Sequence, residues 1–227
     1  MRFLLKEYGS WSVMLISFLA GILISKKITP SSIVSLLSLC LYINSKQAFT
    51  IWIRQKDRRA FYLFSGQTLV ATILILTAFS SDSLKIMPFV SIPIIYLLSL
   101  RFSGEHALIT ELMGFAVLTL SSLIARFSVT GVIDLSLYIA TALFFMAGVL
   151  KVRIQLKKRM SDRVAMIFYI FIAMALYYLI DMPLIILLPL IDNLIFSLTL
   201  YRVRLATTGW IEVAKSISFL ILIYLLR

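Results

Sequence analysis

The sequence predicts an all-α, polytopic membrane protein of about nine transmembrane helices, and three observations lead to that prediction. Hydrophobic residues make up 61% of the 227 positions and charged residues only 14%, whereas soluble domains average about 45–50% and about 25%. The mean hydropathy is +1.02. Apolar stretches of roughly 17–25 residues, the length that crosses the hydrocarbon core as a helix, recur along the whole chain. We therefore expect one integral membrane domain over residues 1–227.

Nine apolar segments are candidate membrane spans. They comprise residues 11–25, 31–53, 60–79, 84–100, 106–125, 131–150, 164–180, 183–200 and 210–226. The first is the shortest, and Phe3-Leu4-Leu5 can lengthen it. The loops between the segments are short except for 151–163, and no linker rich in Pro, Gly or Ser divides the chain. No small-residue cleavage site follows the first segment, so a cleaved signal peptide is not expected.

The net charge of +12 indicates an orientation in the membrane, and we expect no nucleic-acid partner. Lys and Arg collect in the short cytoplasmic loops of membrane proteins. With the N-terminus inside, fifteen cations fall in the cytoplasm: Arg2, Lys6, Arg54, Lys56, Arg58, Arg59, Arg101, Lys151, Arg153, Lys157, Lys158, Arg159, Arg163, Arg202 and Arg204. Five fall outside: Lys26, Lys27, Lys85, Arg126 and Arg227. The asymmetry predicts an inner-membrane protein with its N-terminus in the cytoplasm and its C-terminus outside.

Cysteine and histidine usage argues against several kinds of site. The single cysteine, Cys40, lies in an apolar segment, and the single histidine, His106, begins one. Neither residue supports a disulfide framework or a metal site, and we expect no cofactor. No Cys/His or Ser/His pair of the kind that hydrolases use is visible.

Charged residues recur at the same spacing in the two halves of the chain. Arg101 and Arg202 are 101 residues apart (202 − 101), and so are Glu111 and Glu212 (212 − 111). Basic loops also follow the second and sixth candidate spans. These features indicate a parallel repeat of four helices, and such symmetry commonly places a site where the halves meet. Alternatively, the matching spacings arise by chance in a sequence that is composed mainly of a few apolar residue types.

Polar residues inside the candidate spans fall at one depth. Charged groups within the bilayer are costly and tend to face a bundle interior or a wet cavity. With the N-terminus inside, the cytoplasmic half holds Glu7, Asn44, Lys46, Gln47, Glu105, His106, Glu111, Asp192, Asn193, Glu212 and Lys215. The outer half holds only Asp134 and Asp181. The one-sided distribution predicts a polar cavity that faces the cytoplasm.

Lys46 is the most informative of these residues, because it lies two turns inside its segment, too deep for easy snorkelling. We expect it to pair with Glu111 or Asp192, which lie at a matching depth. Glu212 and Lys215 are three residues apart and can pair on one helix face. Arg101 and Arg202 are expected to rim the mouth of the cavity. Alternatively, these polar residues are helix-end groups that reach the membrane interface.

The segment Lys6-Glu7-Tyr8-Gly9-Ser10-Trp11 has two interpretations. A charged pair followed by an interfacial tryptophan is typical of an anchor at the headgroup level. The segment also resembles the Lys-Glu-His-Gly-Ala-Trp opening of the YwiC-like family of bacterial membrane proteins, with Tyr8 and Ser10 as departures. The basic turn 54–59, the helix start from Glu105 to Glu111 and Gly209-Trp-Ile-Glu212 are similar to that family too. This resemblance implies no established activity.

More distantly, nine helices with functional loops after the second and sixth are similar to the UbiA-type polyprenyltransferases. Those enzymes bind a prenyl diphosphate through Mg²⁺ held by two aspartate-rich motifs, since Mg²⁺ prefers oxygen ligands. Here the first motif position reads Asn44-Ser45-Lys46-Gln47-Ala48, without its aspartates. The second motif region, 151–159, is basic, and Asp162 is the nearest acid. The resemblance therefore implies the fold and not the two-magnesium chemistry.

Three functions remain open. The first is a degenerate UbiA-type fold that binds a lipid-like or prenyl-like anion directly through Lys and Arg, in addition to its contacts with membrane lipids. The second is transport of a small solute or proton, and the third is a membrane scaffold or assembly partner whose polar groups join helices. The candidate ligand-binding residues are Lys6, Glu7, Trp11, Asn44, Lys46, Arg101, Glu105, Glu111, Asp192, Arg202, Glu212 and Lys215.

Overall fold

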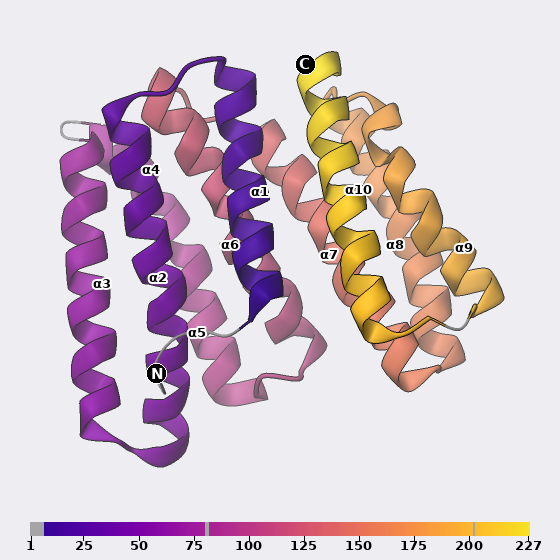
Figure 1. The fold of residues 1–227 in the computed structure, drawn as a ribbon, viewed down its shortest axis with the longest axis horizontal. Coiled ribbons are helices and arrows are strands. Elements are labelled where there is room, and N and C mark those ends of the chain that lie inside the picture. Colours follow the sequence, from indigo (N-terminus) through magenta and orange to yellow (C-terminus); the bar gives the residue numbers. More distant parts are fainter. Residues whose placement is uncertain (1–6, 80–81, 202) are drawn as a thin grey trace. The chain divides into compact units, whose positions relative to one another are not determined.

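A computed structural model describes residues 7–79, 82–201 and 203–227, and every regular element in these ranges is helical (Figure 1). The all-α prediction is confirmed. The described residues form two compact units that divide after Ile133, and each unit is described below by itself. A single membrane domain over the whole chain stays a prediction. Lys6 and Arg202, two of the predicted site residues, lie outside the described residues.

The first unit contains the elements before Ile133. They are α1 (Tyr8–Ser25), α2 (Pro30–Gln55), α3 (Arg58–Phe79), α4 (Ser83–Ile86), the 3₁₀ helix η2 (Met87–Val90), α5 (Ser91–Ser103) and α6 (Leu108–Thr130). Local signals fix their ends. Thr29 Oγ1 accepts from Ser32 N at 3.2 Å, and Ser32 Oγ accepts from Thr29 N at 3.1 Å, so a capping box starts α2 at Pro30.

Small residues let the helices of the first unit approach closely. Gly21 of α1 lies directly against the backbone of Ser122 in α6, and Ser121 Oγ donates to Met14 O at 2.9 Å. Ser38 Oγ of α2 donates to Ala71 O of α3 at 2.7 Å. Small residues and interhelical hydroxyl bonds are typical of helix packing in lipid, where apolar side chains gain little from leaving the solvent.

The second unit contains α7 (Leu135–Lys157), α8 (Met160–Leu179), the 3₁₀ helix η3 (Leu184–Leu190), α9 (Ile191–Thr199) and α10 (Leu205–Leu226). Tyr177 Oη on α8 donates to Ala140 O on α7 at 2.8 Å, within the buried core. At the same end, Arg227 Nη2 contacts both oxygens of Asp134 at 2.7 and 2.9 Å, which holds α10 to the start of α7.

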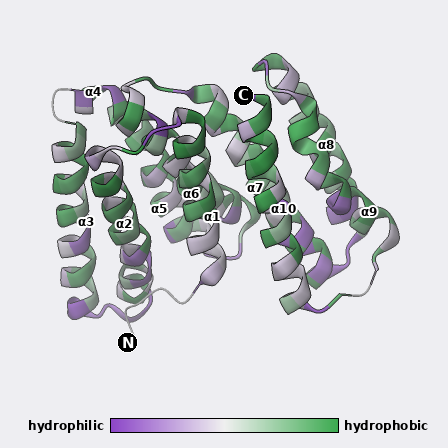
Figure 2. Ribbon diagram, turned by 45° about the horizontal axis from the view of Figure 1, so that its top comes forward, coloured by the Kyte–Doolittle hydropathy of each residue, from purple (hydrophilic) through white to green (hydrophobic). Residues whose placement is uncertain are grey.

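Seven helical stretches are long and apolar enough to cross a membrane, counted over the described residues. They are Tyr8–Ser25, Arg58–Phe79, Ser83–Ser103, Leu108–Thr130, Leu135–Lys157, Met160–Leu179 and Ala206–Leu226. Figure 2 shows hydrophobic middles and hydrophilic ends along most of these helices. The chain is therefore a multi-pass membrane protein, and seven of the nine predicted spans are confirmed as candidates.

The other two predicted spans are helical but differ in composition or length. The helix predicted over 31–53 is α2, which carries Asn44, Ser45, Lys46 and Gln47 in succession. The segment predicted over 183–200 is a shorter apolar helix, Leu184–Thr199. Its first half is the 3₁₀ helix η3, which contains Pro189, and a proline removes an amide donor from the helical ladder.

Candidate functional site

A cluster of charged side chains forms around Lys46 in the first unit. Lys46 Nζ contacts Glu7 Oε2 at 2.7 Å, and Ser10 Oγ donates to the same oxygen at 2.8 Å. Lys46 lies nine residues before the end of α2, which corresponds to about 14 Å along the helix axis. Glu7 is the residue that precedes α1, so the first helix begins at the depth of the lysine and supplies its counter-charge.

Lys46 was expected to meet a carboxylate from Glu111 or Asp192, and the choice of partner was wrong. The partner is Glu7, and Asp192 pairs instead with Lys151 in the second unit. Burial would raise the pKa of Glu7, but the hydrogen bond and the positive charge of Lys46 outweigh burial and hold that pKa below its ordinary value. Glu7 therefore remains ionised beside the lysine.

Tyr96 and Glu105 complete the Lys46 cluster, because both lie close enough to interact with the charge of Lys46. Tyr96 is buried on α5, and Glu105 lies in the turn that leads to α6. Glu105 in turn pairs with Arg54 Nη2, from the last turn of α2. The cluster thus joins the start of α1, the second half of α2 and the α5–α6 turn.

The remaining predicted residues of the first unit lie on the helices that carry this cluster or on α6, which follows Glu105. Asn44 is buried on α2, and Trp11 lies in the first turn of α1. Glu111 lies half-buried in the first turn of α6. Arg101 lies exposed in the last turn of α5 and has no partner among the described residues. An available cation therefore lies five residues beyond Tyr96, at the end of the same helix.

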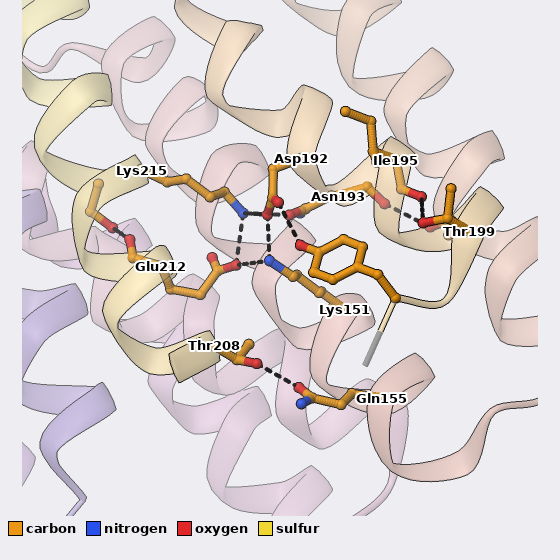
Figure 3. A network of polar contacts seen from close by, with 12 residues as sticks. Lys151, Gln155, Asp192, Asn193, Ile195, Thr199, Thr208, Glu212 and Lys215 are labelled. Atoms are coloured by element: carbon orange, nitrogen blue, oxygen red, sulfur yellow. Dashed lines mark hydrogen bonds and ion pairs between the residues drawn. The ribbon is translucent and has the colours of Figure 1, made fainter. Parts of the chain in front are cut away.

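The second unit holds a network of four charges that is more deeply buried (Figure 3). Lys151 Nζ contacts Asp192 Oδ2 and, at 3.1 Å, Glu212 Oε1. Lys215 Nζ contacts Glu212 Oε1 at 2.7 Å and Asp192 Oδ2 at 3.7 Å. The lysine side chains are 2% and 7% exposed, whereas both carboxylates are 29% exposed. Two cations and two anions balance, so the network is neutral without a ligand.

Hydrogen bonds from neutral side chains complete the network. Lys215 Nζ donates to Asn193 Oδ1, and Tyr201 Oη donates to Asp192 Oδ1 at 2.7 Å. Burial, together with the hydrogen bond to Asp192, raises the pKa of Tyr201 to about 12, because the carboxylate favours the protonated phenol. Three helices, α7, α9 and α10, are thereby joined at one depth.

Further contacts hold the helix ends next to this network. Gln155 Nε2 donates to Val203 O at 2.8 Å, and Thr208 Oγ1 donates to Gln155 Oε1 at 2.9 Å. Arg163 donates to the backbone oxygens of Ser197 and Leu198. These carbonyls belong to the last turns of α9, where a helix leaves acceptors unsatisfied. The side chains of α7 and α8 therefore fix the connection between α9 and α10.

The sequence identified some members of these clusters and missed others. The predicted pairing of Glu212 with Lys215 is confirmed at 2.7 Å. Lys151 was assigned to the 151–163 loop, which was wrong, because α7 continues to Lys157. Ile154 lies three residues after Lys151, on the same helix face, and is fully buried. An apolar residue at this helical spacing is the signal in the sequence that the helix continues beyond Lys151. The role of Tyr201 had no signal in the sequence.

Metal binding is not indicated for the described residues, in which no group of three or more His, Cys, Asp or Glu side chains gathers. An open hollow is lined by Tyr178, Leu179, Asp181, Met182 and Pro183, in the turn between α8 and η3. It lies at the opposite end of the second unit from Lys151, because α8 runs antiparallel to α7.

Comparison with known proteins identifies a family for the chain. Neither a curated protein nor a solved structure matches the chain. The family described as YwiC-like protein matches residues 4–126, which include the Lys46 cluster and all but the end of α6. The match covers more than half of the 227 residues. This polytopic membrane chain, in which Glu7 at the start of α1 pairs with Lys46 in the second half of α2, therefore belongs to the YwiC-like family.

Proposed function

We propose that the chain binds the anionic head of a lipid-like or prenyl-like molecule through the Lys46 cluster. The observation that carries the proposal is the exposure of Lys46, whose side chain is 27% accessible although it lies well inside α2. A charge at that depth is costly unless it is paired or meets a polar ligand. Glu7 supplies one partner, and Lys46 retains further N–H donors that a phosphate or carboxylate can accept.

The charge around this cluster favours an anion. Lys46 and Arg54 are balanced by Glu7 and Glu105, and Arg101 adds a cation without a described partner. Charge-assisted hydrogen bonds from Lys and Arg to phosphate are short and strong. Direct recognition of this kind needs no bridging Mg²⁺, which agrees with the absence of aspartates from 44–48. A UbiA-like arrangement and a parallel repeat remain predictions.

Lys46→Ala is expected to reduce retention of an anionic lipid at least about ten-fold, since a hydrogen bond to a charged group contributes about 1.5–3 kcal/mol. Native mass spectrometry of gently extracted protein measures the retained lipid. Lys85→Ala is the matched control, because Lys85 pairs with Asp82 at 2.8 Å near the other end of the unit.

A second variant distinguishes loss of lipid binding from loss of folding stability, because it is expected to increase binding. Glu7→Gln removes the competing carboxylate and leaves Lys46 in place, so retention of the anionic lipid is expected to rise. If the wild type, Lys46→Ala and Glu7→Gln retain the same amount, the lysine is not a ligand-binding residue.

The orientation of the site is part of the proposal. The distribution of fifteen inner and five outer cations supports a cytoplasmic N-terminus in the bacterial inner membrane, so the Lys46 cluster would face the cytoplasm. In a Cys40→Ala background, a cysteine at position 57 should resist an impermeant thiol reagent added to intact cells, and one at position 227 should react. Labelling at 57 but not at 227 would reverse the orientation.

A role in membrane assembly is the second candidate, and the neutral network of the second unit favours it. Two lysines and two carboxylates satisfy one another there, so the network joins helices without needing an anion. An assembly partner would co-purify with the chain and would be retained by Lys46→Ala. Solute transport has weaker support, because the outer half of the candidate spans holds few charged residues.

A further inference from the structure

We propose that a second site, the basic rim of the second unit, binds phosphate groups of anionic phospholipids in the adjacent leaflet. The basic rim consists of Lys157, Lys158, Arg159 and Arg204. All four side chains are exposed, and none has a hydrogen bond or ion pair within the part of the chain that the structure describes. The proposal is separate from the Lys46 cluster and concerns the membrane surface instead of a single retained molecule.

The rim residues lie together at one end of the unit. Lys157 ends α7, Lys158 follows it, and Arg159 precedes α8. Arg204 precedes α10, and the bond from Gln155 Nε2 to Val203 O holds this part of the chain against the last turns of α7. Two further cations nearby have contacts of their own: Arg163 donates to backbone oxygens, and Arg153 also has a partner. The rim therefore comprises exposed cations without a partner among the described residues.

The side chains next to the rim indicate its position relative to the bilayer. Leu156 and Met160 flank the three consecutive cations and are 64% and 67% exposed. Trp210, in the second turn of α10, is 76% exposed. Exposed apolar residues beside Lys and Arg, with an exposed tryptophan at a similar level, are typical of the membrane–water interface. At that level the partner with complementary charge is the lipid phosphate.

The backbone at Lys158 offers a way to test the proposal. Its φ is +53°, in the left-handed region where glycine is the usual residue at a helix end. The chain accepts backbone strain at this position while it keeps a cation in the turn. Lys56 after α2 repeats the arrangement, with φ of +51°. A cation near a helix C-terminus also interacts favourably with the helix dipole, but glycine would relieve the strain altogether.

Lys158→Gly separates binding from stability, because the two effects have opposite signs. In nanodiscs of phosphatidylcholine alone, relief of the positive φ should raise the unfolding temperature by about 2–4 °C. Phosphatidylglycerol in the nanodiscs should raise the unfolding temperature of the wild type further, and this additional increase should be smaller in Lys158→Gly. Phosphatidylglycerol retained in native mass spectra should fall about five-fold, the effect expected for one cation at an anionic surface.

Two matched variants isolate charge from strain. Lys157→Gln removes a rim cation outside the left-handed region, so it should reduce retained phosphatidylglycerol without raising the unfolding temperature. Asp181→Gly relieves a φ of +54° at the opposite end of the same unit, so it should raise the unfolding temperature and leave phosphatidylglycerol retention unchanged. Because these contacts are exposed, high salt should abolish the lipid effect.

Several outcomes would overturn the proposal. Unchanged phosphatidylglycerol retention in both Lys158→Gly and Lys157→Gln would exclude the rim as a headgroup site. Equal stabilisation by inorganic phosphate in phosphatidylcholine nanodiscs would identify a site for free phosphate and not for lipid. Lys46→Ala should keep the salt-sensitive stabilisation by phosphatidylglycerol, because Lys46 is not part of the rim. Failure of the rim proposal and failure of the proposed function therefore give different results.

Discussion

Replacing Lys151 by alanine is expected to destabilise the protein by about 3–5 kcal/mol, the range measured when one partner of a buried ion pair is removed. Lys151 is 1% exposed and contacts Asp192 on α9 and Glu212 on α10. Without it, two carboxylates would share the single cation of Lys215. Like charges in a low-dielectric environment repel strongly, so α9 and α10 would lose their common attachment to α7. Reversible unfolding in detergent measures the loss.

The control lies on the same helix. Lys157 is exposed in the last turn of α7, and Lys157→Ala should change the free energy of unfolding by less than about 0.5 kcal/mol. A compensated variant, Lys151→Met with Glu212→Gln, removes one charge of each sign and should recover a large part of the loss, because neutral replacement of buried pairs is often tolerated. Equal losses from Lys151→Ala and Lys157→Ala would show that the network contributes no stability.

The hydropathy of the sequence was sufficient to predict the class of fold. Segments such as 106–125 and 131–150 are uniformly apolar, and each is a single helix, although α6 ends at Thr130 and α7 at Lys157, beyond the predicted ends. The internal structure of 84–100 was not predictable from hydropathy alone. There α4, η2 and α5 follow one another, because Pro88 and Pro93 restrict the backbone while the average hydropathy stays the same.

The ends of the helices explain most of the errors at the site. A basic residue near the end of an apolar segment is usually assigned to a loop, because Lys and Arg are common at the membrane–water interface. Lys151 has that appearance, yet α7 extends six residues beyond it. Glu7 precedes the first predicted span, and it was counted among the candidate site residues but not among the expected partners of Lys46. It reaches Lys46 because α1 begins at Tyr8, so the start of the helix and the middle of α2 lie at one level.

Ion pairs between distant segments could not be predicted from the sequence for a different reason. Depth narrows the choice of partners for Lys46 but does not select among carboxylates at the same level, since selection depends on which helices are neighbours. Contacts within one helix need no such information. The Glu212–Lys215 pair follows from a spacing of three residues alone, which is why it was predicted correctly.

Gly21→Ala is expected to destabilise the first unit by about 2–3 kcal/mol, because the added Cβ has no space between α1 and α6. An ideal Cβ at Gly21 would lie 2.4 Å from Ser122 O, 2.7 Å from Ala125 Cβ and 3.0 Å from Arg126 N. Two of these atoms belong to the α6 backbone, which cannot rotate away as a side chain can. The helices would have to separate, and the bond from Ser121 Oγ to Met14 O, now 2.9 Å, would lengthen or break.

Gly66→Ala, on α3, is the matched control for this substitution, since nothing lies within 4 Å of its ideal Cβ. Alanine should stabilise that helix by about 0.5–1 kcal/mol through its lower conformational entropy in the unfolded chain. Unfolding in detergent, followed by helical circular dichroism, compares the two variants in one experiment. Opposite signs are expected. A neutral or stabilising effect of Gly21→Ala would mean that α1 and α6 do not approach as closely as Ser122 and Gly21 indicate, and the shared depth of Glu7 and Lys46 would lose its structural basis.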